Sequence, residues 1–334
     1  MLVLVDRFVF VLLIFSLFLF FIYIWEQTAC CSSTTYAVMT QLPLYPEYVP
    51  HFEEIEKLIQ QNSASNVTAE LVPPYYRLEN RYLVSPPYRL ATCEIEKNMV
   101  TLRHSIFCYL TNTTQFIAQN RSISTEFWDN WLCDETFLRE SISSVKDTIG
   151  PNLTLFAVIR HPVDRFLSGY VDKCLKDLTY YAEENRCFGC QKDMHCFVDA
   201  LHNVFMEYYN NRSKNGRDPE AARMNDFYVR HLAPQTWYCE LKEHRNEYII
   251  LDYHTGPNSK RSIAEDYYKL FERAGVPKNH LETIYSEMMK GTTRHSTANS
   301  LERKVAEQQL LSDTYVMRRL MQMYYYDFKE LGFV

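Results

Sequence analysis

Residues 155–174, LFAVIRHPVDRFLSGYVDKC, constrain the fold of this chain more than any other segment. The apolar run LFAVI has the length of one buried strand, and a stretch with helical periodicity begins at the proline that follows. A second short apolar run, YIILDY at residues 248–253, predicts another buried strand. Strands that are apolar along their whole length need cover on both faces, so these runs indicate a sheet with helices on each side.

Helical patterns alternate with the strand patterns along much of the chain. We expect helices at residues 93–110, 163–178, 193–209, 264–274 and 301–329, the last of them broken near Ser312 and Asp313. This alternation predicts an α/β fold with a central, mainly parallel sheet flanked by helices. The chain has only eight glycines and contains neither a GxGxxG nor a GxxxxGK[ST] phosphate loop. Its net charge of -6 argues against nucleic acid as a partner.

The N-terminal region carries a candidate membrane anchor, because residues 8–25 (FVFVLLIFSLFLFFIYIW) contain no charge. At about 1.5 Å per helical residue they extend roughly 27 Å, close to the ~30 Å apolar core of a bilayer. We expect an uncleaved anchor; the alternative is a signal peptide, whose apolar region usually has about 7 to 15 residues. Arg7 precedes the span and Glu26 follows it, which predicts a type II topology. The expected organisation is a cytosolic tail at 1–7, the anchor at 8–25, a stem at 26–84 and a single lumenal domain at 85–334.

Sequons and cysteines agree with exposure to a secretory lumen. The N-x-[ST] pattern begins at Asn66, Asn112, Asn120, Asn152 and Asn211. Four of the ten cysteines cluster in the order Cys174, Cys187, Cys190 and Cys196. In a reducing cytosol such a cluster would indicate a zinc site, whereas in an oxidising lumen we expect two disulfides. The sequence does not determine which cysteines pair.

Residues 155–174 also contain a candidate anion site. Arg160 directly follows the predicted strand, and ligands of parallel α/β sheets bind beyond the carboxyl ends of strands. Pro162 suits the first turn of a helix, whose unpaired N–H groups favour an anion. Ser168 lies about two helical turns past Arg160, so both side chains could bind one phosphate. The alternative interpretation is a surface arginine and a solvent-facing serine on an amphipathic helix.

A second candidate anion site is the segment SPPYRLATCEIEKNMVTLRHSIFCYL, residues 85–110. A proline-rich turn leads to Thr92, which we expect to be the N-cap of a helix. Arg89 precedes that helix and Lys97 lies near its start, so both cations could neutralise an anion there. The acidic residues Glu94 and Glu96 favour the helix dipole but oppose a bound anion.

Together these two segments resemble the membrane-bound carbohydrate sulfotransferases, the group with the chondroitin 4-O, dermatan 4-O and HNK-1 type enzymes, in a divergent invertebrate-like branch. That family carries the pattern R-[DHE]-P-x-x-R-x-x-S-x-[YF]-x-x-K. The pattern is complete here, as Arg160, His161, Pro162, Arg165, Ser168, Tyr170 and Lys173. Residues 230–253 and the C-terminal YYYDFKELGF resemble further family segments, so the resemblance covers about residues 83–334. It implies a P-loop-NTPase-like sulfotransferase fold.

The resemblance also implies a co-substrate and the residues that bind it. The donor is 3'-phosphoadenosine 5'-phosphosulfate (PAPS), and no metal takes part. Arg160 and Ser168 are then expected to hold its 3'-phosphate. The early segment, with Thr92, Cys93 and Lys97, is expected to hold its 5'-phosphosulfate. Pro87 stands where the family has a lysine, so Arg89 and Lys97 are the expected substitutes.

His231 is the candidate general base, because a neutral imidazole accepts a proton near neutral pH. His104 and His295 are competing candidates, and the alternative for His231 is a structural histidine before Pro234. The resulting prediction is a Golgi type II sulfotransferase that transfers the sulfonate of PAPS to a glycan hydroxyl, on a chondroitin/dermatan-type or related chain. Pro87 motivates one alternative, a catalytically impaired lumenal glycan-binding protein. A glycosyltransferase is a third possibility, which the absence of a DxD motif disfavours.

Overall fold

The computed structural model describes residues 45–61, 69–126, 131–133, 137–177, 181–210, 219–290 and 297–334. These residues belong to one compact unit, Tyr45–Val334. The predicted cytosolic tail, membrane anchor and first part of the stem lie outside the described residues, as does His295. Within the described ranges, no helix has the length and apolar character needed to cross a bilayer.

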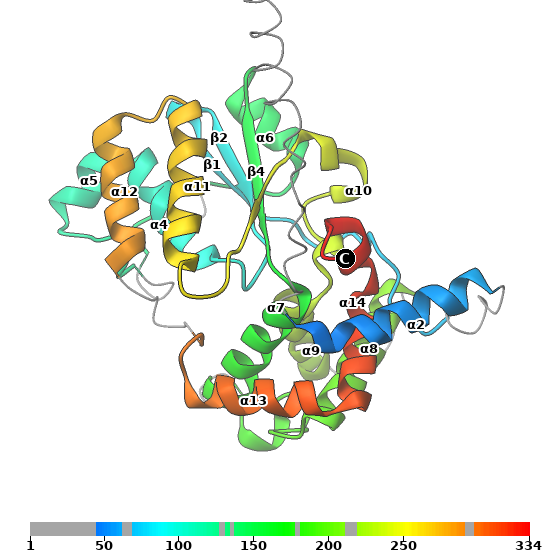
Figure 1. Cartoon of the computed structure of the whole chain (residues 1–334). Coiled ribbons are helices and arrows are strands. Elements are labelled where there is room, and N and C mark those ends of the chain that lie inside the picture. The colour runs from blue at the N-terminus through cyan, green and yellow to red at the C-terminus, as the bar shows by residue number, and fades with distance from the viewer. Residues whose placement is uncertain are drawn as a thin grey trace, which may run out of the picture. The chain divides into compact units, whose positions relative to one another are not determined.

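A five-stranded sheet forms the centre of the unit (Figure 1). Its spatial order is β3 (Leu138–Arg139), β1 (Tyr82–Ser85), β2 (Leu90–Cys93), β4 (Thr154–Ile159) and β5 (Ile249–Asp252). The pairs β2–β4 and β4–β5 are parallel, while β1 pairs antiparallel with both β2 and β3. The predicted α/β class and the presence of both predicted strands are therefore confirmed. The prediction that the second strand is buried is wrong, because β5 is an edge strand that is buried only at Leu251. The sheet is mixed because β1 and β2 form a hairpin that the sequence analysis did not predict.

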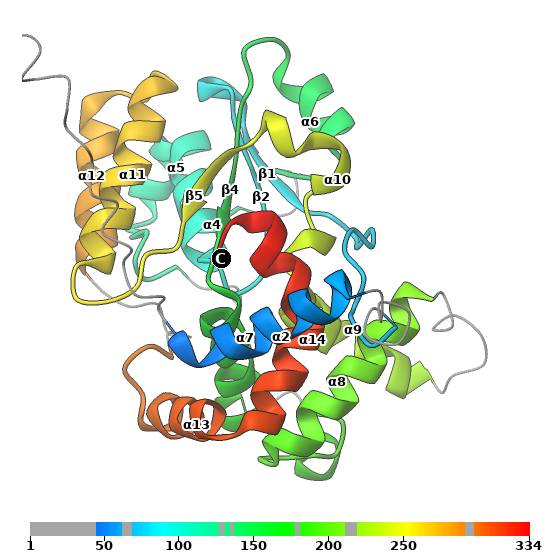
Figure 2. The ribbon, with the colours of Figure 1, turned by 45° about the vertical axis from the view of Figure 1, so that its right-hand side comes forward.

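The two faces of the sheet pack against different sets of helices (Figures 1 and 2). Alternate residues of β4 point to opposite faces, as the period of a strand requires. Phe156 and Val158 pack in a cluster with α4 (Val100–Thr111), α11 (Ser259–Arg273) and α12 (Lys278–Lys290). Leu155, Ala157 and Ile159 pack in a second cluster with α7 (Pro162–Tyr170), α8 (Met194–Tyr209) and α14 (Thr314–Leu331). Both faces are covered, which explains why β4 is apolar throughout.

The remaining helices complete the two layers. They are α2 (Val49–Gln60), α5 (Thr113–Ala118), α6 (Ile142–Ile149), α9 (Pro219–Leu232), α10 (Leu241–His244) and α13 (Leu301–Ser312). The predicted break near Ser312 is confirmed, because Asp313 separates α13 from α14. The Asp313 carboxylate accepts hydrogen bonds from the backbone N–H groups of Tyr315 and Val316, at 3.0 and 3.2 Å, and so begins the new helix.

The predicted boundary of the stem at residue 84 is too late in the chain. Helix α2 packs on α14, where the Phe52 ring stacks on Tyr325 at 5.3 Å between centroids. The Tyr48 hydroxyl donates a hydrogen bond of 2.7 Å to the carbonyl of Phe333. Leu71 is also fully buried. The described residues from Tyr45 onwards therefore belong to the folded unit, held by contacts between residues far apart in the sequence.

Candidate functional site

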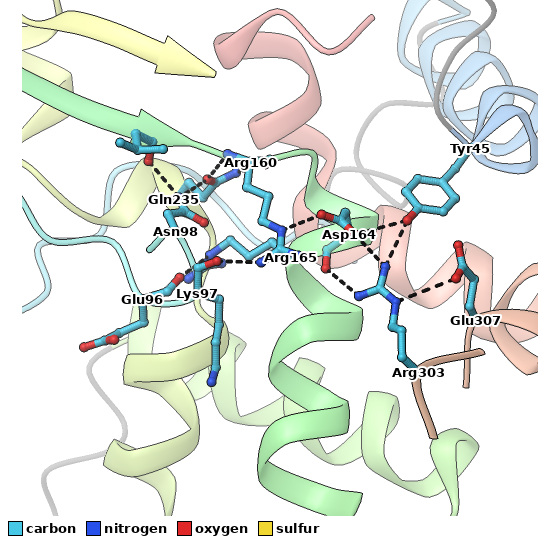
Figure 3. Close-up of polar contacts among 11 residues, drawn as sticks. Tyr45, Glu96, Lys97, Asn98, Arg160, Asp164, Arg165, Gln235, Arg303 and Glu307 are labelled. Carbon is cyan, nitrogen blue, oxygen red and sulfur yellow. Dashed lines mark hydrogen bonds and ion pairs between the residues drawn. The ribbon is translucent and has the colours of Figure 1, made fainter. Parts of the chain in front are cut away.

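The loop of residues 94–99 connects β2 to α4 and lies at the same sheet edge as the turn between β4 and α7. The two loops meet because β2 and β4 run parallel, which brings their carboxyl ends together. Arg160 Nη1 donates a hydrogen bond of 2.7 Å to the Lys97 carbonyl, and Arg165 Nε donates one of 2.9 Å to the Glu96 carbonyl. Figure 3 shows both guanidinium groups against this loop. The structure thus joins the two segments that the sequence analysis singled out.

Buried amides fix the path of the β2–α4 loop. Asn98 Nδ2 donates hydrogen bonds of 2.8 Å to the Val158 carbonyl and to Gln235 Oε1. Gln235 in turn binds both backbone groups of Arg160, accepting from its N–H at 2.9 Å and donating to its carbonyl at 2.7 Å. Met99, the N-cap residue of α4, has φ of 66° and supplies no side-chain cap. The first turn of α4 therefore keeps backbone N–H groups for an anion.

The Lys97 ammonium lies in a buried group of charges at the far end of α7. It forms an ion pair with Asp172 Oδ2, and Lys173 Nζ lies 3.2 Å from the same oxygen. Lys173 also lies 3.1 Å from Asp177. Burial lowers the pKa of Lys97, an effect that Asp172 opposes and Lys173 reinforces. Asp172 and Lys173 belong to a π-helix, Val171–Lys176, a type of turn often found at functional sites.

Arg160 is buried and held by a carboxylate (Figure 3). Its Nε donates a hydrogen bond of 2.5 Å to Asp164 Oδ2, and its guanidinium carbon lies 4.1 Å from the Tyr253 ring centroid. Asp164 Oδ1 also accepts from Arg303 Nη2, at 2.5 Å. Burial alone would raise the pKa of Asp164, but Arg160 and Arg303 lower it to about 2. Nη2 is the Arg160 side-chain nitrogen without a partner among the described residues, and Ser168 is buried on α7, the helix that begins two residues after Arg160.

His231 is the penultimate residue of α9, and the charges of Lys97 and Lys173 act on its ring. Its Nδ1 donates a hydrogen bond of 2.7 Å to the Phe227 carbonyl, so Nε2 carries the lone pair of the neutral ring. Burial, together with Lys97 and Lys173, lowers the pKa of His231 to about 3, against the opposing effect of Glu96. An anion bound by the two lysines would offset their charge and make Nε2 more basic. The competing His104 instead stacks on Trp131 at 3.7 Å, with Nε2 3.3 Å from Glu94.

Arg89 does not belong to this site. It is an exposed, left-handed residue (φ 52°) between the turn Pro86–Tyr88 and the first residue of β2. Lys97 follows the last residue of β2, so the two cations lie at opposite edges of the sheet. The prediction that they share one sulfonate is wrong, because the proline-rich turn closes a β-hairpin instead of leading into a helix. Pro87 lies in that hairpin turn too, so it no longer motivates a catalytically impaired protein.

Thr92 and Cys93 were also predicted incorrectly. Both are fully buried in β2 and neither caps a helix, since α4 begins only at Val100. Thr92 Oγ1 accepts a hydrogen bond of 2.9 Å from Arg103 Nη1. Cys93 forms a disulfide with Cys239. Neither side chain is available to PAPS; their contribution is to hold the strand from which the loop departs.

The cysteine cluster forms disulfides, as expected for an oxidising compartment. The pairs are Cys174–Cys187 and Cys190–Cys196. A further disulfide joins Cys108 to Cys133. Within the described ranges, no three histidine, cysteine or acidic residues are grouped in a way that could hold a metal ion.

Three residues that hold the predicted site residues in place were not predicted from the sequence. Asp164, Asp172 and Gln235 each bind a residue that was predicted. One signal was available: Asp164 follows Arg160 by four residues at the start of a predicted helix, the spacing of a helical ion pair. Gln235 and Arg303 come from distant parts of the chain and had no such signal.

The His161 side chain, next to Arg160 in the sequence, is surrounded by four aromatic rings. The ring centroids of Tyr45, Tyr48, Phe328 and Phe333 lie 5.3 to 5.5 Å from its own. Both ring nitrogens are buried, with no hydrogen-bond partner among the residues that the structure describes. Burial therefore lowers the pKa of His161 to about 4, although Asp164 opposes this shift. The folded protein holds the ring neutral where the unfolded chain would protonate it.

We expect His161→Phe to reduce the sensitivity of the fold to acid. The unfolded state binds a proton at about pH 6.5 that the folded state binds only near pH 4, so His161 costs stability as pH falls through this window. At about pH 4.5 the cost should reach about 2 kcal/mol relative to pH 7. Urea unfolding of both proteins at the two pH values measures it. His104 and His231 are present in both proteins, so their contributions cancel in the comparison. An equal change in the free energy of unfolding between the two pH values for both proteins would contradict this account.

The parallel loops, the uncapped helix and the buried cations define an α/β protein with a candidate anion site at the carboxyl ends of its parallel strands. A sequence model of the sulfotransferase family matches residues 80–334, so the chain belongs to the sulfotransferase family and is a sulfotransferase enzyme. It is 33% identical over 276 residues to the uncharacterized protein C18B2.2 of Caenorhabditis elegans, covering 80% of this chain and 73% of that one. It is 25% identical over 323 residues to carbohydrate sulfotransferase chst-1 of the same nematode, covering 91% and 95%. No solved structure matches the chain.

Proposed function

We propose that this enzyme transfers the sulfonate of PAPS to a hydroxyl of a glycan of the chondroitin/dermatan type or a related kind. The observation that carries the proposal is the junction of the two strand-to-helix loops, where Arg160 binds the carbonyl of Lys97. One loop offers the N-terminus of α4 and the Lys97 cation, and the other offers Arg160 and Ser168. Two anions on one nucleotide fit this arrangement. The name of the nematode relative chst-1 supports a carbohydrate as the acceptor.

The reaction we propose is an in-line displacement at sulfur. The acceptor oxygen attacks, a new S–O bond forms, and the bond between sulfur and the 5'-phosphate oxygen breaks to release 3',5'-ADP. The proton of the acceptor hydroxyl passes to Nε2 of His231. Lys97 neutralises charge on the transferring group, while the N–H groups of α4 stabilise the leaving phosphate. Arg165 and Gln235 keep the two loops in place for these contacts.

The proposed location is the Golgi membrane, in a type II orientation with the catalytic unit in the lumen. The uncharged span of residues 8–25, the sequons and the disulfides support it. Both a nucleotide sulfonate donor and glycan acceptors would then meet the enzyme on the same side of the membrane.

Incubation of the full-length protein with radiolabelled PAPS and a panel of glycans tests this function. We expect label on at least one glycan together with release of 3',5'-ADP. Saturable glycan binding without transfer would favour a binding protein on the same fold. A lack of affinity for 3',5'-ADP would reject PAPS as the donor.

The prediction for the nucleotide is that Arg160→Ala weakens binding of 3',5'-ADP. One charge-assisted contact is worth on the order of 1.5 to 3 kcal/mol, or roughly 10- to 150-fold in affinity. Ser168→Ala should cost less, about 0.5 to 1.5 kcal/mol, because a hydroxyl is neutral. Calorimetry measures these affinities.

Two controls accompany this measurement. Arg89→Ala removes an exposed arginine at the opposite sheet edge and should leave the affinity unchanged. Binding of 5'-AMP should respond less to Arg160→Ala, because that nucleotide has no 3'-phosphate. Equal losses for both nucleotides would show that Arg160 acts only by holding the Lys97 loop.

A further inference from the structure

Asp172 forms an ion pair with Lys97, the cation that the proposed reaction needs. The Lys97 ammonium forms its ion pair with Asp172 Oδ2, and both side chains are largely buried, at 12% and 5% exposure. Figure 3 shows the Lys97 side chain pointing away from Arg160, although its carbonyl accepts a hydrogen bond from that residue. The backbone of Lys97 is thus fixed at the sheet edge, while its ammonium group contacts a carboxylate in the π-helix that follows α7, four residues beyond Ser168.

The charges around this contact favour an exchangeable anion. Two ammonium groups, of Lys97 and Lys173, share Asp172 Oδ2. His231 and Glu96 are further titratable groups close to Lys97, and burial, together with the positive charges of the lysines, lowers the pKa of His231 and holds its ring neutral. Asp177 lies on the Lys173 side of the cluster. The ammonium groups are already removed from water, so replacing one anionic partner by another requires little further desolvation of the cations.

We propose that Asp172 is a positioning residue that holds Lys97 when no donor is bound and is displaced from it by the sulfonate of the donor. This inference rests on the proposed function, because it takes PAPS as the incoming anion. Asp172 keeps the buried lysine protonated, which favours anion binding, and at the same time competes with the anion for it. The balance between carboxylate and sulfonate then sets the affinity for the donor.

The test is Asp172→Asn, with binding of PAPS to the full-length protein measured by calorimetry without acceptor. The amide keeps the shape of the carboxylate but loses its charge, so we expect donor affinity to rise by roughly tenfold. A residue with a purely structural role would weaken binding when replaced, so the direction of the change separates the two cases. Circular dichroism checks that the variant is folded.

Two further variants isolate the role of Lys97. Asp177→Asn removes a carboxylate from the same segment that contacts Lys173 with no described contact to Lys97, and it should change affinity by less than about twofold. In a Lys97→Gln background, Asp172→Asn should bring no gain, because the ammonium that it releases is absent. An equal gain in that background would show general charge repulsion and overturn the proposal.

The outcomes separate this inference from the proposed function. If the wild type binds PAPS and Asp172→Asn binds it equally or more weakly, the inference fails and the donor assignment stands. If only the variant binds PAPS, the inference is supported, since the carboxylate then blocks the site. If neither protein binds PAPS or 3',5'-ADP, both the inference and the proposed donor are wrong.

Discussion

Replacing Lys97 by glutamine is expected to lower kcat/KM for sulfonate transfer by about 10²- to 10³-fold, the usual cost of removing one preorganised donor to developing charge. The buried environment makes the contact strong, because little water screens the ammonium. Most of the loss should fall on kcat, since we assign Lys97 to the transferring sulfonate, whose charge distribution changes in the transition state. Steady-state kinetics with varied PAPS and a saturating acceptor measures both constants.

Two variants control the Lys97 experiment. Lys278→Gln removes a lysine that is 79% exposed on α12, and it should leave both constants unchanged. Lys97→Arg keeps the charge but changes its geometry, so it should recover part of the activity. If Lys97→Gln kept wild-type kcat, the site would need another cation for the sulfonate, and Lys173 would be the first to examine.

The strands that were predicted correctly are those whose residues form one short, largely apolar run in the sequence. β4 is buried along almost its entire length between two layers of helices, so its sequence is a continuous apolar run. β1 lies at the boundary predicted for the stem, and the helical pattern of α4 extended backwards over β2. The hairpin was therefore missed, and Arg89 and Thr92 were assigned to a helix start that lies further along the chain.

The residues of the site also differ in whether a local sequence pattern could reveal them. The backbone of Lys97 does meet Arg160 where β2 and β4 end, and His231 lies close enough for the charge of Lys97 to act on it. Ser168 lies on α7, in the motif that begins at Arg160, and its role stays a prediction. The groups that orient them depend on the tertiary fold: Arg303 reaches Asp164 across 139 residues of sequence, and Gln235 reaches Arg160 across 75. No local pattern encodes such contacts, so the carboxylates and amides behind the cations could be found only in the structure.

The disulfide between Cys93 and Cys239 connects that tertiary arrangement to the site. Cys93 is the last residue of β2, directly before the loop that carries Lys97. Cys239 follows Tyr238, whose hydroxyl lies 3.3 Å from Arg165 Nη2, and Arg165 also binds the Glu96 carbonyl. The covalent link therefore holds the two backbones from which the loop is positioned.

We expect the double variant Cys93→Ala/Cys239→Ala to lose about 5 kcal/mol of unfolding free energy, because this disulfide closes a 146-residue loop in the unfolded chain. Replacing Cys190 and Cys196 is the matched control: that disulfide closes a 6-residue loop, which gives about 2 kcal/mol. Urea unfolding of the three proteins without reductant measures the difference. Donor affinity should fall with the first pair even where the variant is folded, since the Lys97 loop loses its anchor. Equal losses of stability for both pairs would mean that native contacts, and not loop closure, determine what each disulfide contributes.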